Sequence, residues 1–416
     1  MIRIQKFVYW ICIGYLFMLL CSIYFDNRFN PTCVLIQSCQ VIFHKCGLYK
    51  GTFCRRPTDD SNRIKLNPIH HHTKDNKRNQ QHEQWLLTQQ STLEAEYYSA
   101  DRHQNTSVQQ LDLRRQSQAL QNGNYLRRYP ITSYWANRSD IKPCKKDAFI
   151  LLVINSKPNN IYRRNGIRKS WGDGGKQIHQ MNHPYAWRTV FVIGQSRDRY
   201  LNMNIENEAK RYGDVVIGQF IDHFKNLTEK TILGMHWAET YCHPQYYYKG
   251  DDDVFVNPSY LFHYLKERSN RLHNTSTTSS SRPILWAGNV GKNNRDVVRL
   301  NTSKYYVSRQ DYSQPIYPKY CSGFAYIMSS NVLHGMLVAA QYKKKIQSID
   351  DVFIGMLGHQ LGLTPRHDYR FNVQNYPRTL RYVSINKLCR LFAIHGITSP
   401  IRQMRMLRRV HNFCRY

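Results

Sequence analysis

The chain has 416 residues, enough for one large domain with appendages or for two ordinary domains. Its formal net charge is +31, from 59 Lys and Arg against 28 Asp and Glu. The basic residues are spread along the chain without a Lys/Arg block, and no RNA-recognition or zinc-finger pattern is present. The charge therefore indicates only a general attraction to anionic partners.

The first structural feature in chain order is an uncharged run of 19 residues at positions 7–25, long enough to span a bilayer as a helix. Arg3 and Lys6 precede it, so residues 1–6 are expected to stay cytoplasmic. A cleaved signal peptide is the alternative, but the run is longer than a usual signal-peptide core and no clear cleavage site follows. The pattern favours an uncleaved single-pass anchor.

Residues 26–143 are predicted to be a largely disordered lumenal stem. Residues 62–121 are rich in Gln, Asn, His, Arg and Ser, and such a stretch cannot bury enough apolar surface to offset its ordering entropy. Cysteines near the membrane suggest disulfides, within the chain or in a homodimer, because no Cys-x-x-Cys pair supports zinc. These cysteines are Cys33, Cys39, Cys46 and Cys54.

Sequons for N-glycosylation follow the apolar run and none precedes it. Their placement agrees with a lumenal C-terminal portion, in which no nucleic-acid partner is expected. The acceptor asparagines are Asn105, Asn137, Asn226, Asn274 and Asn301.

Ordered structure is expected over residues 144–416. The continuous apolar run at 148–154 is typical of a strand covered on both faces. Strand and helix patterns then alternate, which predicts an α/β fold with a mainly parallel twisted sheet flanked by helices. The helical stretches are 162–171, 205–212 and 227–241, and the strands are 189–193, 214–217 and 246–249.

Asp251, Asp252 and Asp253 follow the last of these strands, where ligands bind in such sheets. Alternate side chains share a face in an extended segment, so Asp251 and Asp253 can point together while Asp252 points away. Two carboxylates on one face suit Mn²⁺ or Mg²⁺ holding a diphosphate. A solvated acidic turn is the plainer alternative, but three adjacent charges beside a core strand repel one another without a cation. An EF-hand calcium loop is excluded, because its glycine and glutamate are missing.

The second half of the domain is less regular. Residues 268–282 are rich in Ser, Thr and Asn and are predicted to form an exposed loop. Residues 283–288 are expected to form a strand, and 317–328 to join an aromatic loop to a strand or helix. A second acidic pair, Asp350-Asp351, directly precedes a helical pattern, and His395 ends an apolar run.

From about residue 148 to 395 the chain resembles the β1,3-galactosyltransferase and β1,3-N-acetylglucosaminyltransferase family. The motifs that carry the resemblance stand in the family's order. They are Arg163-Arg-Asn-Gly-Ile-Arg168 with Ser170-Trp-Gly172, Tyr212-Gly-Asp-Val-Val216 with Asp222, Asn226-Leu-Thr-Glu-Lys-Thr231 with Trp237 and Cys242, Lys249 with Asp251-Asp-Asp-Val-Phe-Val-Asn257, Tyr317-Pro with Tyr320-Cys-Ser-Gly323, and Asp350-Asp-Val352.

The resemblance implies a type II Golgi membrane enzyme with a GT-A-like nucleotide-sugar transferase domain. Such enzymes transfer galactose or an N-acetylhexosamine from a UDP-sugar to an acceptor glycan on a glycoprotein or glycolipid, with inversion. UDP-galactose and UDP-N-acetylglucosamine are both open as the donor. Mn²⁺, with Mg²⁺ as the alternative, is expected on Asp251 and Asp253 as a Lewis acid for the departing diphosphate.

The resemblance also assigns the nucleotide-sugar site. Its expected members are Arg164, Arg168, Asp222, Lys230, Asp251 and Asp252, because arginine suits bidentate phosphate contacts. Arg163 and Lys169 are interpreted as ordinary solvated helix charges. His395 is expected to complete the metal shell, with a purely structural histidine as the alternative.

Asp351 is the expected catalytic base, since the family's acidic pair places its second carboxylate there. A helix N-cap is the alternative interpretation of this pair. The family usually has Glu at the first position, so Asp350 is one methylene shorter. Asp350 is placed in the sugar and acceptor pocket.

The remaining expectations concern pocket shape, a disulfide and loss of activity. Trp286, Gly288, Tyr320 and Gly323 are placed in the sugar pocket, with aromatic core packing as the alternative. Cys242 and Cys321 are the suggested disulfide pair. A lumenal glycan-binding protein that kept the fold without catalysis is the alternative function.

Overall fold

The computed structural model describes residues 107–122, 129, 144, 148–172, 187–275, 284–291, 296–373 and 385–416. The predicted cytoplasmic tail, membrane run and stem cysteines lie outside these residues, as do the sequons at Asn105 and Asn137. Within the described ranges, no helix has both the length and the apolar character needed to cross a bilayer.

A seven-stranded mixed sheet forms the centre of the fold, in the order β3-β2-β1-β4-β7-β6-β8. Its strands are β1 (Ile150–Asn155), β2 (Trp187–Gln195), β3 (Val215–Ile221), β4 (Tyr246–Asp251), β6 (Trp286–Val290), β7 (Cys321–Ser329) and β8 (Arg366–His367). The first four strands in this order are mutually parallel, and β8 is parallel to β6. Strand β7 is antiparallel to both β4 and β6. The predicted α/β class with a mainly parallel sheet is thus confirmed.

A second, three-stranded sheet follows the Asp triplet, in the order β5-β10-β9. Its strands are β5 (Val254–Val256), β9 (Phe371–Asn372) and β10 (Ala393–His395). Strands β5 and β10 are antiparallel, with His395 opposite Val254. This register brings the last part of the chain beside the Asp triplet.

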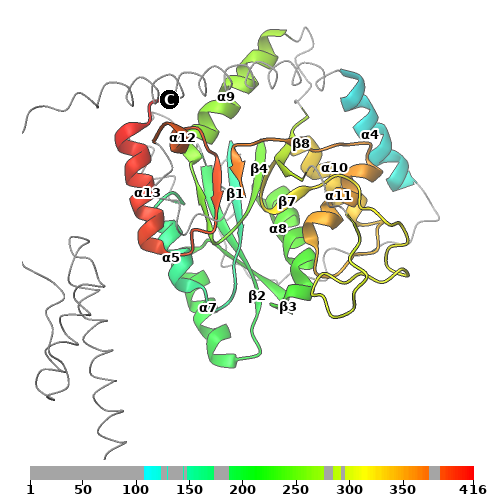
Figure 1. Ribbon diagram of the computed structural model, residues 1–416, viewed down its shortest axis with the longest axis horizontal. Helices are drawn as coiled ribbons and strands as arrows, with labels where there is room; N and C mark the ends of the chain where they lie inside the picture. The colour runs from blue at the N-terminus through cyan, green and yellow to red at the C-terminus, as the bar shows by residue number, and fades with distance from the viewer. Residues whose placement is uncertain are drawn as a thin grey trace, which may run out of the picture. The chain divides into compact units, whose positions relative to one another are not determined.

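Helices cover both faces of the main sheet (Figure 1). Along β1, Ile150, Leu152 and Ile154 contribute to the core on one face, and Leu151 and Val153 to the core on the other. The first face is covered by α5 (Ile161–Arg168), α9 (Pro258–Thr275), α12 (Ile385–Cys389) and α13 (Pro400–Phe413). The second is covered by α4 (Ser107–Asn122), α8 (Leu227–Tyr241), α10 (Ser330–Ala340) and α11 (Asp350–Gln360). Helix α7 (Arg199–Tyr212) packs at the β3 edge.

Two predicted boundaries are wrong. Helix α4 lies inside the predicted stem, yet its Leu113 and Ser117 are buried against α10. A Cβ on Gly335 of α10 would lie 3.0 Å from Leu113 Cδ1, so the absent side chain makes room for α4. The predicted loop at 268–282 is also too long, because α9 continues to Thr275 and Arg268 is buried.

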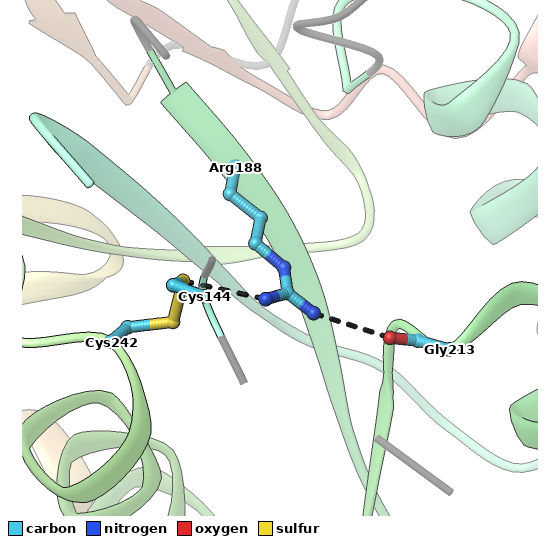
Figure 2. The surroundings of a disulfide bond; sticks show 4 residues. All are labelled: Cys144, Arg188, Gly213 and Cys242. Atoms are coloured by element: carbon cyan, nitrogen blue, oxygen red, sulfur yellow. Dashed lines mark hydrogen bonds between the residues drawn. A yellow bond between two sulfur atoms is a disulfide. The ribbon is translucent and has the colours of Figure 1, made fainter. Parts of the chain in front are cut away.

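The predicted Cys242–Cys321 disulfide is also wrong. Cys242 pairs with Cys144, and Cys389 pairs with Cys414. Cys144 N donates to Tyr241 O at 3.0 Å, which places the start of the domain beside the end of α8. Arg188 donates to Cys144 Sγ at 3.4 Å and to Gly213 O at 3.3 Å (Figure 2). Cys321 is a buried free thiol at the start of β7.

Candidate active site

The Asp triplet lies where β1 and β4 end side by side. Asn155 pairs with Asp251 in the parallel register, and Asp252 N donates to Asn155 O at 3.1 Å. Asp252 then points away from Asp251, as the alternation along an extended segment predicts.

Asp252 anchors the loop after β1 and the start of α5. Its Oδ2 accepts hydrogen bonds from Ser156 Oγ at 2.7 Å and Asn160 Nδ2 at 2.8 Å. Its Oδ1 accepts from Arg163 Nη1, also at 2.8 Å. Because these protein donors occupy both oxygens of a buried carboxylate, the contacts argue against the predicted direct role of Asp252 in nucleotide-sugar binding.

Arg163 is the arginine nearest to the candidate metal ligands. Besides its bond to Asp252, its Nη1 lies 3.9 Å from Asp253 Oδ2. Its side chain is 20% exposed, so the guanidinium can meet a ligand from solvent. Burial lowers the pKa of Arg163, but the hydrogen bonds to Tyr162 and Asp252 more than offset this, and the pKa is raised overall. The interpretation of Arg163 as a solvated helix charge is therefore wrong.

Arg164, by contrast, is fully buried, and its predicted contact with the nucleotide is wrong. Its guanidinium pairs with both oxygens of Glu208 at 2.8 and 2.7 Å. It also donates to Ser156 Oγ and to the Lys157 and Pro158 carbonyls. Arg164 thus joins α5 to α7 and to the loop after β1.

Arg168 is also paired with protein carboxylates. It pairs with Asp214 through two hydrogen bonds and with Glu208 at 2.7 Å, and its guanidinium stacks on the Tyr212 ring at 4.0 Å. These contacts argue against a phosphate contact for Arg168. Helix α5 thus presents one of its three arginines, Arg163, toward the triplet.

Asp222 and Lys230, both assigned to the nucleotide-sugar site, form an ion pair. Lys230 Nζ is 2.6 Å from Asp222 Oδ2 and donates to Ser156 O at 2.9 Å. Asp222 Oδ2 also accepts from Gly194 N at 2.8 Å, which joins the ends of β2 and β3. Burial lowers the pKa of Lys230 despite the neighbouring Asp222, Asp251 and Asp252. This ion pair lies beside the ends of β1, β2 and β3.

Lys249 joins the two acidic motifs. This buried side chain of β4 donates to Asp251 Oδ1 at 3.0 Å and to the Gly323 carbonyl, and its Nζ lies 3.5 Å from Asp350 Oδ2. Burial by itself lowers the pKa of Lys249, but Asp251 and Asp350 more than offset this and raise the pKa. A charged ammonium therefore holds the carboxylates of two distant segments in one cluster.

The acidic pair at the start of α11 does not act as an N-cap. The N-cap position is Ile349, and no side chain makes a capping hydrogen bond there. Asp350 Oδ2 instead accepts from Thr231 Oγ1 at 2.6 Å. Asp351 Oδ2 accepts from Gly323 N at 3.1 Å, and its Oδ1 accepts from Val352 N at 2.9 Å. Asp350 is buried, whereas Asp351 is only partly buried.

The carboxylates of this cluster hold protons more tightly than usual. Burial, with the charge of Asp350, raises the pKa of Asp351 to about 6, although Lys249 and two backbone N–H groups oppose the rise. Burial, with Asp350 and Asp253, raises the pKa of Asp251 to about 7, against the opposing effect of Lys249. The Asp251 side chain is 39% exposed, so water moderates its rise. A cluster of this kind favours a bound cation.

Asp253 and His395 form the best-placed pair for a metal ion. The β5–β10 register brings His395 Nε2 to 3.7 Å from Asp253 Oδ1, and both side chains are 29% exposed. Within the described residues, no three His, Cys, Asp or Glu side chains are already gathered in a metal-binding arrangement. The donor set of carboxylate and imidazole suits Mn²⁺ with its remaining positions filled by ligand and water oxygens.

The four predicted pocket residues divide into two pairs. Gly323 contacts the base candidate through its N–H, and a Cβ there would lie 3.3 Å from Asp351 Cβ. Tyr320 packs beside α11 at Gly355. Trp286 is buried in the core against Gly358 and Met336, so the core-packing alternative holds for it. Gly288 allows close packing of β6 on Tyr326 and Cys321 and has no pocket role here.

The sequence motifs do not assign a role to every residue of the site. Lys249 and Thr231 lie within motifs without an assigned role, and Asn155 lies outside them. A lysine inside an otherwise apolar strand needs a buried partner, and that signal could have identified Lys249. No sequence signal distinguishes Arg163 from Arg164, because only the orientation of α5 decides which of them faces the triplet.

Comparison with known proteins identifies a family and sequence relatives for this chain. A family model described as Galactosyltransferase matches residues 162–369. A lactosylceramide 1,3-N-acetyl-beta-D-glucosaminyltransferase of Homo sapiens is 32% identical over 231 residues, covering 55% of this chain and 58% of that protein. A beta-1,3-galactosyltransferase 1 of Mus musculus is 31% identical over 238 residues, covering 55% and 66%. The chain thus spans about six tenths of the length of these relatives.

Among solved structures, a galactosyltransferase crystallised with donor and acceptor sugar analogues aligns over 62% of this chain and 95% of its own. The sequence identity is 13% and the TM-score is 0.28.

Proposed function

This chain belongs to the galactosyltransferase family, and on that premise we propose that it is an inverting β1,3-hexosyltransferase. It transfers galactose or N-acetylglucosamine from a UDP donor to a hydroxyl of an acceptor glycan. We propose a GT-A-like arrangement in which the nucleotide lies over the ends of β1, β2 and β4. The observation that carries the proposal is the Lys249 bridge between Asp251 and Asp350, because it gathers both acidic motifs at one place.

Asp351 is proposed as the general base. Its Oδ2 is held by Gly323 N, and the raised pKa suits a group that must accept a proton near neutral pH. The hydroxyl oxygen attacks the anomeric carbon as its proton passes to Asp351. The bond from that carbon to the UDP oxygen breaks, which inverts the anomeric centre.

The residues beside the triplet are proposed to bind the departing diphosphate. Asp253 and His395 would hold a divalent cation, for which Mn²⁺ is preferred and Mg²⁺ is the alternative, and Asp251 would support it. When bound, that cation supplies Lewis-acid stabilisation of the leaving phosphate. Arg163, 3.9 Å from Asp253 and partly exposed, adds a second positive charge beside the same oxygens.

The acceptor is proposed to be a glycolipid or glycoprotein glycan. Relatives named for lactosylceramide favour the glycolipid, and the relative named as a galactosyltransferase keeps both donor sugars open. We also propose a type II Golgi membrane protein with a lumenal catalytic domain. Its sequon residue Asn301 is exposed, and its two disulfides suit an oxidising lumen.

The proposal is tested by UDP release from the full chain with UDP-galactose and UDP-N-acetylglucosamine, each with lactosyl and N-acetylglucosaminyl acceptors. We expect one donor to give acceptor-dependent release that requires Mn²⁺ or Mg²⁺ and stops with a chelator. The product linkage, read by nuclear magnetic resonance, should be β1,3.

A lumenal glycan-binding protein without catalysis is the second candidate, and the shortened Asp350 is what favours it. This alternative predicts that calorimetry detects donor binding but that no product forms with any combination of donor and acceptor. Donor binding without turnover would overturn the enzymatic proposal, whereas product formation excludes this alternative.

A further inference from the structure

Gln403 of helix α13 is a buried amide that has no part in the reaction proposed above. It is 2% exposed and lies on the inner side of α13, which packs beside α5 (Figure 1). Its Oε1 accepts a hydrogen bond from Trp171 Nε1 at 2.7 Å. Its Nε2 donates to Val254 O at 3.1 Å and to Ile397 O at 2.9 Å. The three partners are themselves buried, so this amide connects segments in the interior of the domain.

The chemistry of the three partners matches glutamine specifically. An indole N–H can only donate, so it requires the amide oxygen, whereas two carbonyls can only accept, so they require the amide N–H groups. Ionised glutamate has no donor for the carbonyls, methionine has no N–H or O–H group, and asparagine is one methylene shorter. Loss of the amide would therefore leave a buried donor and two buried acceptors without this partner.

The two carbonyls belong to the segments that carry the candidate metal ligands. Val254 directly follows Asp253, and Ile397 lies two residues after His395. The side chains of Asp253 and His395 approach to 3.7 Å. The two segments also bond to each other, since Ile397 N donates to Asp253 O at 2.6 Å. A single amide on α13 thus holds the backbone beside both members of the pair.

We propose that Gln403 is a positioning residue for the divalent cation held by Asp253 and His395. This role rests on the proposed function, and it assigns to α13 a side chain that touches neither cation nor substrate. Its hydrogen bonds fix the two ligand-bearing segments relative to each other before a cation binds. Less ordering then remains to be done on binding, and residues behind the ligands commonly strengthen metal affinity in this way.

A purely structural role for Gln403 predicts a different result. Loss of its three hydrogen bonds would then lower the free energy of unfolding and nothing else. Those molecules that remain folded would bind Mn²⁺ as tightly as the parent chain does. The two roles are therefore separated by measuring the affinity for Mn²⁺ in the folded protein.

Gln403→Met is the first test, because methionine keeps the length of the side chain and removes its N–H groups. Mn²⁺ binding to the full chain in the presence of UDP is followed by electron paramagnetic resonance of the free ion, which needs no turnover. We expect the substitution to weaken Mn²⁺ binding by about tenfold. Turnover should approach the parent kcat as Mn²⁺ is raised, because Asp253 and His395 are still present.

Ser329→Ala is the matched control for a loss of stability. Ser329 is also 2% exposed, and its hydroxyl accepts from Leu285 N at 2.9 Å. It pairs with Tyr246 at the start of β4, whereas the Asp triplet lies at the other end of that strand. This variant should unfold more readily than the parent and keep the parent's affinity for Mn²⁺.

Trp171→Phe is the second test and applies even where Gln403→Met does not fold. It keeps an aromatic ring and removes the indole N–H that fixes the oxygen of Gln403. We expect Mn²⁺ binding to weaken by about threefold, the effect of one lost hydrogen bond. Hydrogen exchange of the metal-free chain adds a readout of position, since the Ile397 amide should exchange faster in both variants than in Ser329→Ala.

Unchanged Mn²⁺ affinity in the folded variants of Gln403 and Trp171 would overturn this role, as would an equal loss of affinity in Ser329→Ala. The parent chain would still bind Mn²⁺ and turn over in these outcomes, so the proposed function would stand. A parent chain that binds no Mn²⁺ in the presence of UDP would instead contradict the proposed cation site, and the role of Gln403 would fall with it.

Discussion

Lys249 Nζ lies 3.5 Å from Asp350 Oδ2, and this contact joins a strand of the main sheet to a helix that begins far downstream in the sequence. The same ammonium holds Asp251 at 3.0 Å. The acidic motifs of the triplet and of α11 are thus parts of one electrostatic cluster.

Asp351→Asn should retain donor binding and lose transfer by about 10³-fold, since the amide keeps the shape of the side chain but cannot accept the proton. Calorimetry with UDP and product formation measure the two properties. Asp311→Asn is the matched control, because Asp311 is a surface carboxylate paired with Lys344. Transfer within a few-fold of the parent would show that Asp351 is not the base.

Activity should fall in acid as Asp351 takes up a proton. Burial and Asp350 raise the pKa of Asp351 to about 6, and only its ionised form can act as a base. kcat/KM should therefore be level above about pH 7 and drop about tenfold per pH unit below about pH 5. A pH profile at saturating metal measures this, and a profile that is flat down to pH 4 would contradict it.

Asp253→Ala and His395→Gln should both weaken metal-dependent nucleotide binding. Asp253→Ala removes a charged ligand and should abolish the effect of Mn²⁺ on UDP affinity. His395→Gln should reduce that Mn²⁺ effect by about 10- to 100-fold. Titrations of UDP with and without Mn²⁺ give the difference. An Mn²⁺ effect that persists unchanged in Asp253→Ala would place the cation elsewhere.

Arg163→Met should raise KM for the donor more than tenfold, because it removes the guanidinium beside Asp253 and one of the donors to Asp252. Arg163→Lys should recover only part of the loss, since an ammonium cannot bridge both carboxylates in the same way. The control is Lys169→Met, which removes an exposed charge from the residue that follows α5. Equal donor KM in the parent and Arg163→Met would contradict the assignment.

The Cys144–Cys242 disulfide should stabilise the domain strongly because it closes a long loop, with a sequence separation of 98. Replacing both cysteines by serine should lower the free energy of unfolding by about 2 to 5 kcal/mol. Chemical denaturation measures this loss. Cys321→Ala, which affects a buried free thiol, should change stability less and leave the disulfide content unchanged.

Much of the main sheet could be predicted from sequence, because strands buried on both faces appear as continuous apolar runs. The run at 148–154 became β1, and helix α8 has the predicted bounds. Helix α4 could not be found in this way, since its buried side offers little beyond Leu113 and Ser117 and depends on the space beside Gly335.

Within the site, motif order indicated which segments meet but not which side chains face one another. Asp222 pairs with Lys230, which the resemblance assigns to the same site, and Asp351 accepts a hydrogen bond from Gly323 N. Arg164 was the arginine expected to face the nucleotide, but Arg163 is the one beside the triplet. The reason is that the rotation of α5 about its axis depends on its packing against α13 and Glu208. Disulfide pairing likewise depends on which chain ends are neighbours, and spacing does not reveal this.

The three-stranded sheet β5-β10-β9 matters for the design of truncated fragments of this protein. The family model stops at residue 369, yet β9 and β10 follow it, and β10 supplies His395 beside Asp253. Fragments designed on those limits would also begin after Ser156 and Asn160, the donors that hold Asp252. Such a fragment could still contain the Asp triplet and the Asp350–Asp351 pair and show no activity, so a negative result from it would say nothing about the intact chain.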